Sequence, residues 1–170
     1  GGVGAEQDYS KARELFEKAA LQGNATAQNQ LGYLYQFGLG VEQNYSKARE
    51  WYEKAAAQGD ANAQSNLGYL YQHGLGVEQD YTKAREWYEK AAAQGVADAQ
   101  NQLGYLYKEG LGGEQDYTKA REWYEKAAAQ GHATAQSNLG YLYQYGQGVE
   151  QDYTKAREWW EKSAAQIGRA

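Results

Sequence analysis

The 170-residue sequence contains no cysteine, no methionine and no proline, and it has only two phenylalanines. The absence of cysteine excludes disulfide bonds, thiolate metal ligands and a cysteine nucleophile, and it leaves the redox compartment open. Because there is no methionine, the chain does not begin at its own start codon. We therefore expect a processed product, an excised segment or an engineered chain, and we assign no cellular location.

The sequence also lacks a basic excess and a long hydrophobic run. The formal net charge is −5 and the isoelectric point is about 5.1, whereas nucleic-acid binding depends on clustered lysine and arginine. No segment approaches the roughly 18 consecutive apolar residues of a membrane helix. We therefore expect neither a nucleic-acid partner nor a membrane partner.

What the sequence does contain is a repeat of 36 residues. Trp51, Trp87, Trp123 and Trp159 are separated by this step, and so are four glycines that begin with Gly32. The blocks are 5–40, 41–76, 77–112 and 113–148, followed by a partial block from residue 149. The second and third blocks differ at only eight positions, which indicates recent duplication or consensus design. A period of this length predicts stacked helical units in a single array, residues 1–170.

Each block contains two helical patterns. The later one is expected over residues 80–94, because Ala84, Trp87, Tyr88 and Ala91 share one face of a helix. We expect Asp80 to cap the start of this second helix. The four repeated tryptophans are expected in the core. Replacing Trp87 by alanine would then cost about 3–5 kcal/mol.

The earlier pattern predicts a first helix over residues 61–73. Its buried stripe is expected to comprise Ala63, Leu67, Leu70 and Tyr71. Gly68 inside this helix costs about 1 kcal/mol relative to alanine, so its repetition predicts a close contact that leaves no room for a Cβ atom. Glycines at 74 and 76 end the helix and open the following turn.

Neither helix can bury its apolar side alone, so neighbouring blocks must stack into an all-α solenoid. We expect nine helices, four first helices and five second helices. The segment GGVGAEQ is predicted to be a turn, so the array begins with a lone second helix at about 8–22. The last helix is expected at about 152–165. We also expect the exposed N-terminal helix, which carries Leu15 and Phe16, to self-associate into a homo-oligomer.

The repeat closely resembles the Sel-one-like repeat (SLR) family, a relative of the tetratricopeptide repeat. The residues of one block that match the family pattern are Ala61, Ala63, Gln64, Leu67, Gly68, Tyr71, Gly74, Gly76, Val77, Asp80, Lys83, Ala84, Trp87, Tyr88, Lys90, Ala91 and Ala92. The resemblance covers nearly the whole chain and implies a right-handed superhelix of helical hairpins. It also implies a role in protein interaction. The sequence departs from the family pattern at single positions, such as Gly113, Gln147 and Trp160.

By resemblance to tetratricopeptide arrays, the first helices line a concave groove. Helical angles place one set of residues opposite the buried stripe, toward a peptide or protein ligand. The expected groove residues are Tyr33, Gln36, Phe37, Asn62, Ser65, Tyr69, Gln72, His73, Asp98, Asn101, Tyr105, Lys108, Glu109, Ser137, Tyr141, Gln144 and Tyr145.

Two interpretations of the four repeated groove tyrosines remain open. Tyr33, Tyr69, Tyr105 and Tyr141 could form a ladder for an extended peptide, because tyrosine gives a large contact area with a polar end. The rings could instead fill crevices between successive first helices. Beside them, Asn-Gln alternates with Ser-Asn from block to block, which suggests that a two-block unit was copied. The residues at exposed positions of the first helices also vary between blocks. Neutral sequence drift, or the choice of a designer, would explain this variation as well as ligand binding does.

The motifs of catalysis and cofactor binding are weak. His73 and His132 are not equivalent in the repeat, so they do not predict a metal site. The Gly-Leu-Gly turns lack the lysine and the strand of a phosphate loop. We expect no cofactor and no enzymatic activity, and instead a protein- or peptide-binding scaffold. The alternative is a consensus or designed structural array with no natural ligand, which self-assembles through its open ends.

Overall fold

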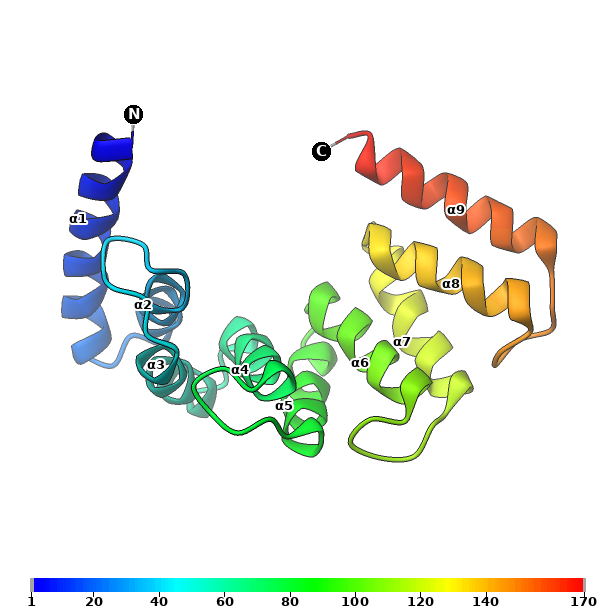
Figure 1. Ribbon diagram of the computed structural model, residues 1–170, viewed down its shortest axis with the longest axis horizontal. Helices are drawn as coiled ribbons and strands as arrows, with labels where there is room; N and C mark the ends of the chain where they lie inside the picture. Colours follow the sequence, from blue (N-terminus) through cyan, green and yellow to red (C-terminus); the bar gives the residue numbers. More distant parts are fainter. Residues whose placement is uncertain (1, 170) are drawn as a thin grey trace. The chain divides into compact units, whose positions relative to one another are not determined.

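The computed structural model describes residues 2–169, and all regular secondary structure in this range is helical (Figure 1). The described range contains nine helices, which confirms the predicted all-α class and the number of helices. They are α1 (Gly2–Leu21), α2 (Ala25–Phe37), α3 (Tyr45–Ala57), α4 (Ala61–His73), α5 (Tyr81–Ala93), α6 (Ala97–Glu109), α7 (Tyr117–Ala129), α8 (Ala133–Tyr145) and α9 (Tyr153–Ile167).

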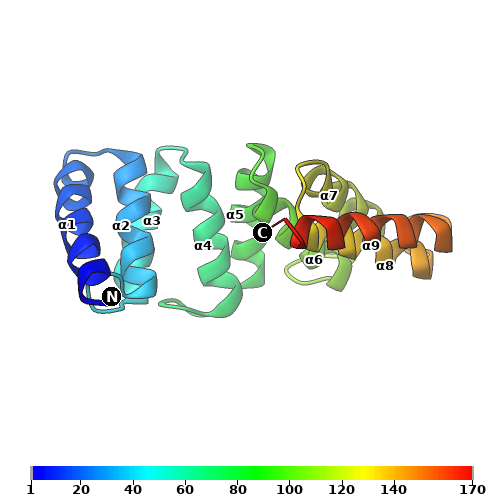
Figure 2. The ribbon, with the colours of Figure 1, turned by 90° about the horizontal axis from the view of Figure 1, so that it is seen from above.

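The helices group into two compact units whose boundary lies inside α5. The first unit ends at Trp87 and the second begins at Tyr88. In the first unit, α1 packs on α2, α2 on α3 and α3 on α4; in the second, α6 packs on α7, α7 on α8 and α8 on α9 (Figure 2). A single array over residues 1–170 stays a prediction, and its end residues Gly1 and Ala170 lie outside the described range.

The local signals for helix ends are confirmed. The predicted helices over 61–73 and 80–94 are α4 and α5. The Asp80 carboxylate accepts the backbone N–H of Lys83 at 3.0 Å, so it caps the helix as expected. Gly38 ends α2 in the left-handed conformation, with φ of 67°, where glycine avoids the Cβ clash of other residues.

The N-terminal turn is a wrong prediction, because α1 is already helical at Gly2. In a later block, the turn is held by the first helix before it: the Gln43 side chain donates to the Gln36 carbonyl at 2.8 Å. The equivalent Gln7 lies inside α1. The helix extends back from Ala5 and Glu6, which are good helix formers, through Gly2, Val3 and Gly4, which are not.

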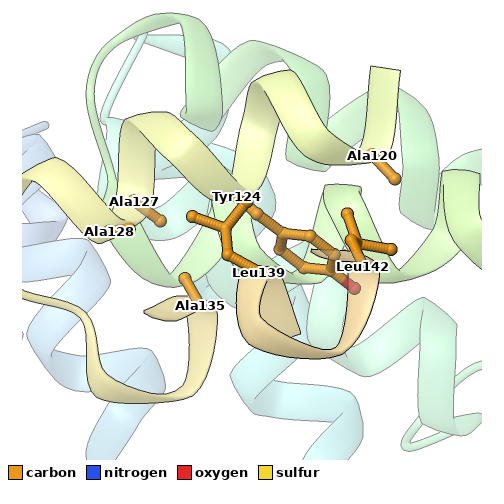
Figure 3. Packing of buried hydrophobic residues seen from close by; sticks show 7 residues of the cluster. All are labelled: Ala120, Tyr124, Ala127, Ala128, Ala135, Leu139 and Leu142. Atoms are coloured by element: carbon orange, nitrogen blue, oxygen red, sulfur yellow. The ribbon is translucent and has the colours of Figure 1, made fainter. Parts of the chain in front are cut away.

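The cores of three hairpins are built around a tyrosine. In the second unit, Tyr124 is fully buried among alanines of α7 and leucines of α8 (Figure 3). The labelled cluster comprises Ala120, Tyr124, Ala127, Ala128, Ala135, Leu139 and Leu142. Tyr52 and Tyr88 are equally buried. The aromatic side chain at the centre of the core is therefore the tyrosine that follows Trp51, Trp87 and Trp123, and Trp160 takes the equivalent position after Trp159.

The prediction that the tryptophans lie in the core is wrong in one respect, because their side chains are less deeply buried than expected. Trp51, Trp123 and Trp159 are only half-buried. The ammonium of Lys54 lies 4.5 Å from the ring centroid of Trp51, and Lys126 lies at the same distance over Trp123. The indole therefore covers the rim of the core, with one face in a cation–π contact.

The repeated glycine within the first helices does mark a close contact, as predicted. A Cβ atom on Gly32 would lie 2.7 Å from two ring atoms of Tyr52, and one on Gly104 would lie equally close to Tyr124. The partner is an aromatic ring of the following helix. The glycine and the buried tyrosine thus form one matched pair in each of these hairpins.

Candidate functional site

Buried glutamines hold the first helices in place. The Gln28 side chain donates to the Ala20 carbonyl at 3.1 Å, and its Oε1 accepts from Gln58 Nε2 at 2.9 Å. Gln58 Nε2 also donates to the carbonyl of Gly23. Gln100 and Gln130 repeat this arrangement in the second unit. The signal in the sequence is a glutamine at the same position of every block, which matches the family pattern but does not by itself reveal this role.

An amide bridge joins the first helices within each unit. The Asn66 side chain of α4 donates to Asn29 Oδ1 of α2 at 3.0 Å, and Asn138 of α8 donates to Asn101 Oδ1 of α6 at 3.0 Å. These contacts explain the alternation of Asn-Gln with Ser-Asn, because each bridge requires asparagines at two different positions. The alternating pair therefore fixes the contact between α2 and α4, and between α6 and α8.

The four groove tyrosines are partly exposed. Tyr33, Tyr69, Tyr105 and Tyr141 retain between 40% and 46% of their accessible surface. Some of the rings pack against an aromatic neighbour: Tyr33 against Phe37 at a centroid distance of 4.6 Å, and Tyr141 against Trp160 at 5.3 Å. These two contacts lie within α2 and between α8 and α9, not between successive first helices, so both interpretations stay predictions.

The other expected groove residues divide by exposure. Exposed are Phe37, Asn62, His73, Asp98, Glu109 and Tyr145, and half-buried are Ser65, Lys108, Ser137 and Gln144. Gln36, Gln72 and Asn101 are buried, so their expected position at an open groove is corrected. Gln36 Oε1 accepts the Tyr52 hydroxyl at 2.6 Å, and Asn101 accepts the amide bridge. Helical angles placed them at the edge of the groove side, where the neighbouring helix covers them.

Charge on the exposed sides of the first helices is concentrated on α6. Asp98 Oδ1 lies 2.7 Å from His132 Nε2, while His132 Nδ1 accepts the backbone N–H of Ala135 at 3.2 Å and so caps α8. An accepting Nδ1 leaves the proton on Nε2, which donates to the carboxylate. This hydrogen bond lowers the pKa of Asp98 below its ordinary value. Lys108 and Glu109 form a looser pair at 3.7 Å.

The turns enclose small polar cavities that recur with the repeat. One of about 460 Å³ is lined by Arg121, Tyr143 and Lys155, among other residues, and a counterpart in the first unit is lined by Tyr35 and Lys47. A recurring cavity does not single out one reactive centre.

Burial raises the pKa of Tyr52 and Tyr124, so these phenols stay protonated at neutral pH.

Within residues 2–169, no three or more His, Cys, Asp and Glu side chains gather where they could hold a metal ion. None of the helices in that range combines the length and the apolar character needed to cross a membrane.

Comparison with known proteins identifies the repeat. The family described as "Sel1 repeat" matches residues 1–24, 25–60, 61–96, 97–132 and 133–166. These matches have the predicted period of 36 residues, with each full repeat beginning at a first helix. No curated protein matches the sequence significantly.

Several solved structures are similar to the chain. The protective antigen c5321 of uropathogenic Escherichia coli, which has an SLR fold, is 42% identical over 93% of this chain, with a TM-score of 0.87. A Sel1 repeat protein from Oxalobacter formigenes is 41% identical over 94%, with a TM-score of 0.88. The chain covers 34% and 64% of the lengths of these two proteins. Cysteine-rich protein B of Helicobacter pylori is 27% identical over 79% of this chain and 97% of its own length, with a TM-score of 0.60.

These similarities extend over nearly the whole sequence and agree with the arrangement of paired helices. Proteins built from Sel1 repeats are generally protein-interaction scaffolds and typically have no enzymatic activity. The chain belongs to the Sel1 repeat family and folds as an α-solenoid of 36-residue helical hairpins.

Proposed function

We propose that the protein binds extended segments of other proteins, without catalysis, on the exposed sides of its first helices. Each unit presents one such surface: α2 and α4 in the first, α6 and α8 in the second. The observation that carries the proposal is a pair of partly exposed tyrosines on each unit, Tyr33 and Tyr69 on the first and Tyr105 and Tyr141 on the second. Tyrosine gives a large contact area at a low cost in conformational entropy.

The surroundings of the tyrosines support this role. The glutamine contacts and the amide bridges hold the first helices in fixed positions. A surface that is ordered before binding loses little entropy when a ligand arrives. Exposed Asn62 and half-buried Ser65 supply side-chain donors and acceptors beside Tyr69. They suit the main chain of an extended ligand, while the rings contact its side chains.

The proposal is tested by a peptide-array screen of the parent chain and of a variant in which the four tyrosines are replaced by alanine. Circular dichroism first confirms that both proteins are folded. We expect peptides that bind the parent and are lost in the variant. If neither protein binds any peptide, or if the variant binds as well as the parent, the proposal is contradicted. A structural array without a ligand is then the better account.

Self-association through α1 is a second candidate, favoured by the exposure of Val3, Leu15 and Leu21 on this helix. Light scattering after size exclusion, at high micromolar protein concentration, distinguishes the two states. A dimeric mass that becomes monomeric with Leu15→Glu would support self-association. A monomeric mass for the parent would contradict it.

A further inference from the structure

The four first helices are nearly identical, but their exposed sides differ in charge. At the first variable position the residues are Thr26, Asn62, Asp98 and Thr134, and at the last they are Phe37, His73, Glu109 and Tyr145. Carboxylates occur at these positions only on α6. The sides of α2, α4 and α8 carry uncharged polar and aromatic residues there, so α6 is where a ligand's charge would be read.

The two carboxylates of α6 lie on the same side as its tyrosine. Asp98, Tyr105 and Glu109 are spaced by seven and four residues, which places them in one row along a helix. The Asp98 side chain is 84% exposed and that of Glu109 is 44% exposed. Tyr105 is exposed between them. The row therefore presents a carboxylate on each side of an open aromatic ring.

The neighbouring helix α8 extends this surface with two more rings. Tyr141 is 46% exposed and Tyr145 is 63% exposed. The contact of Asp98 with His132 and the bridge between Asn101 and Asn138 hold α8 beside α6. We call the five residues Asp98, Tyr105, Glu109, Tyr141 and Tyr145 the α6–α8 surface. Two of its three tyrosines, Tyr105 and Tyr141, are the repeated tyrosines of the second unit.

The two carboxylates of this surface outnumber the lysine beside them. His132 donates to Asp98 through Nε2 while its Nδ1 accepts a backbone N–H, and this contact leaves the Asp98 side chain 84% exposed. Lys108 is the one cation among the expected groove residues of α6 and α8. Its Nζ lies 3.7 Å from Glu109 Oε1, beyond the length of a hydrogen bond. The whole chain adds to this sign with a net charge of −5.

We infer that the α6–α8 surface binds a basic peptide segment, with an arginine or lysine side chain held between a carboxylate and a tyrosine ring. A guanidinium pairs with a carboxylate and stacks on an aromatic face at the same time, so arginine fits best. This inference rests on the proposed function and adds the chemical class of the ligand. It assigns the recognition of charge to the second unit, because the equivalent positions of α2 and α4 have no carboxylate.

The test compares matched peptides on ¹⁵N-labelled protein by NMR titration. The probes are 12-residue glycine–serine peptides that carry three arginines, three glutamines or three glutamates at the same positions. The proteins are the parent, the double variant Asp98→Asn/Glu109→Gln, and the control Glu114→Gln/Glu150→Gln. The control removes the same charge from exposed turns. A fourth protein carries Lys108→Gln, the residue of the other three blocks.

We expect the arginine peptide to shift the amide signals of α6 and α8, and to bind more tightly than the glutamine peptide. The double variant in α6 should weaken its binding about fivefold, since two exposed ion pairs are lost while the tyrosine rings remain. The control should change the affinity less than twofold. Lys108→Gln should tighten binding about twofold, because a competing cation is removed.

Equal affinity for the arginine and glutamine peptides would overturn the inference, and so would an equal loss in the control variant. The inference would also be overturned if the arginine peptide shifted no amide signal of α6 or α8. The proposed function is judged separately by the peptide array. If uncharged peptides bind there and depend on the four tyrosines, the proposed function stands while the basic ligand is rejected.

Discussion

Replacing Tyr124 by alanine should destabilise the protein more than replacing its neighbour Trp123. Tyr124 is fully buried at the centre of the cluster between α7 and α8, and losing a large buried aromatic side chain costs about 3–5 kcal/mol. Trp123 is half-buried, with Lys126 over its ring. Half of the roughly 150–250 Å² that such a ring buries, at about 25 cal/mol per Å², gives about 2–3 kcal/mol.

Equilibrium urea unfolding, followed by far-ultraviolet circular dichroism, measures both differences against the parent. Trp123→Ala is the matched control, since it removes an adjacent aromatic side chain from the same helix. The slope with urea should stay constant if the folded and unfolded states keep their exposed surface. If Trp123→Ala costs as much as Tyr124→Ala, or more, the assignment of the tyrosine to the centre of the core is wrong.

Three more predictions follow from individual contacts. Gly104→Ala would stabilise an open helix by about 1 kcal/mol, but here the new Cβ meets the Tyr124 ring at 2.7 Å, so we expect a loss of about 1–3 kcal/mol in urea unfolding; a more stable variant would refute this. Asn66→Ala should cost about 1–3 kcal/mol because its partner amide is left buried and unpaired, and a loss within error of zero in the same assay would speak against the bridge. The lowered folded pKa of Asp98 means that its hydrogen bond with His132 stabilises the fold above the unfolded pKa of about 3.9. This contribution is lost as pH falls through the folded value, so Asp98→Asn should flatten the acid side of the stability profile; identical profiles for parent and variant would contradict it.

The repeat, the helices and most of their ends could be predicted from the sequence because these features depend on local spacing. The stripe of Leu67 and Leu70 and the cap at Asp80 are examples. Periodicity indicates which side of a helix is buried but not how deeply. Trp123 and Tyr124 lie about 100° apart on one helix, and only the neighbouring glycine of α6 determines that the tyrosine reaches the centre.

The errors at the candidate surface have a similar origin. Gln36 lies at the edge of the exposed side of α2, and the hydroxyl of Tyr52 from the next helix decides that it is buried. The bridge between Asn29 and Asn66 was visible as an alternating pair, but its geometry depends on the contact between two blocks. In each case, a residue distant in sequence decides the local outcome.

The central claim, that ligands bind on the exposed sides of the first helices, is tested most directly by mapping a bound peptide. A peptide selected on the array is titrated into ¹⁵N-labelled protein, and the change of each amide signal is recorded. The account predicts the largest changes on α2, α4, α6 and α8, around Tyr33, Tyr69, Tyr105 and Tyr141. Changes centred on the second helices, such as at the exposed Tyr153 of α9, would contradict it.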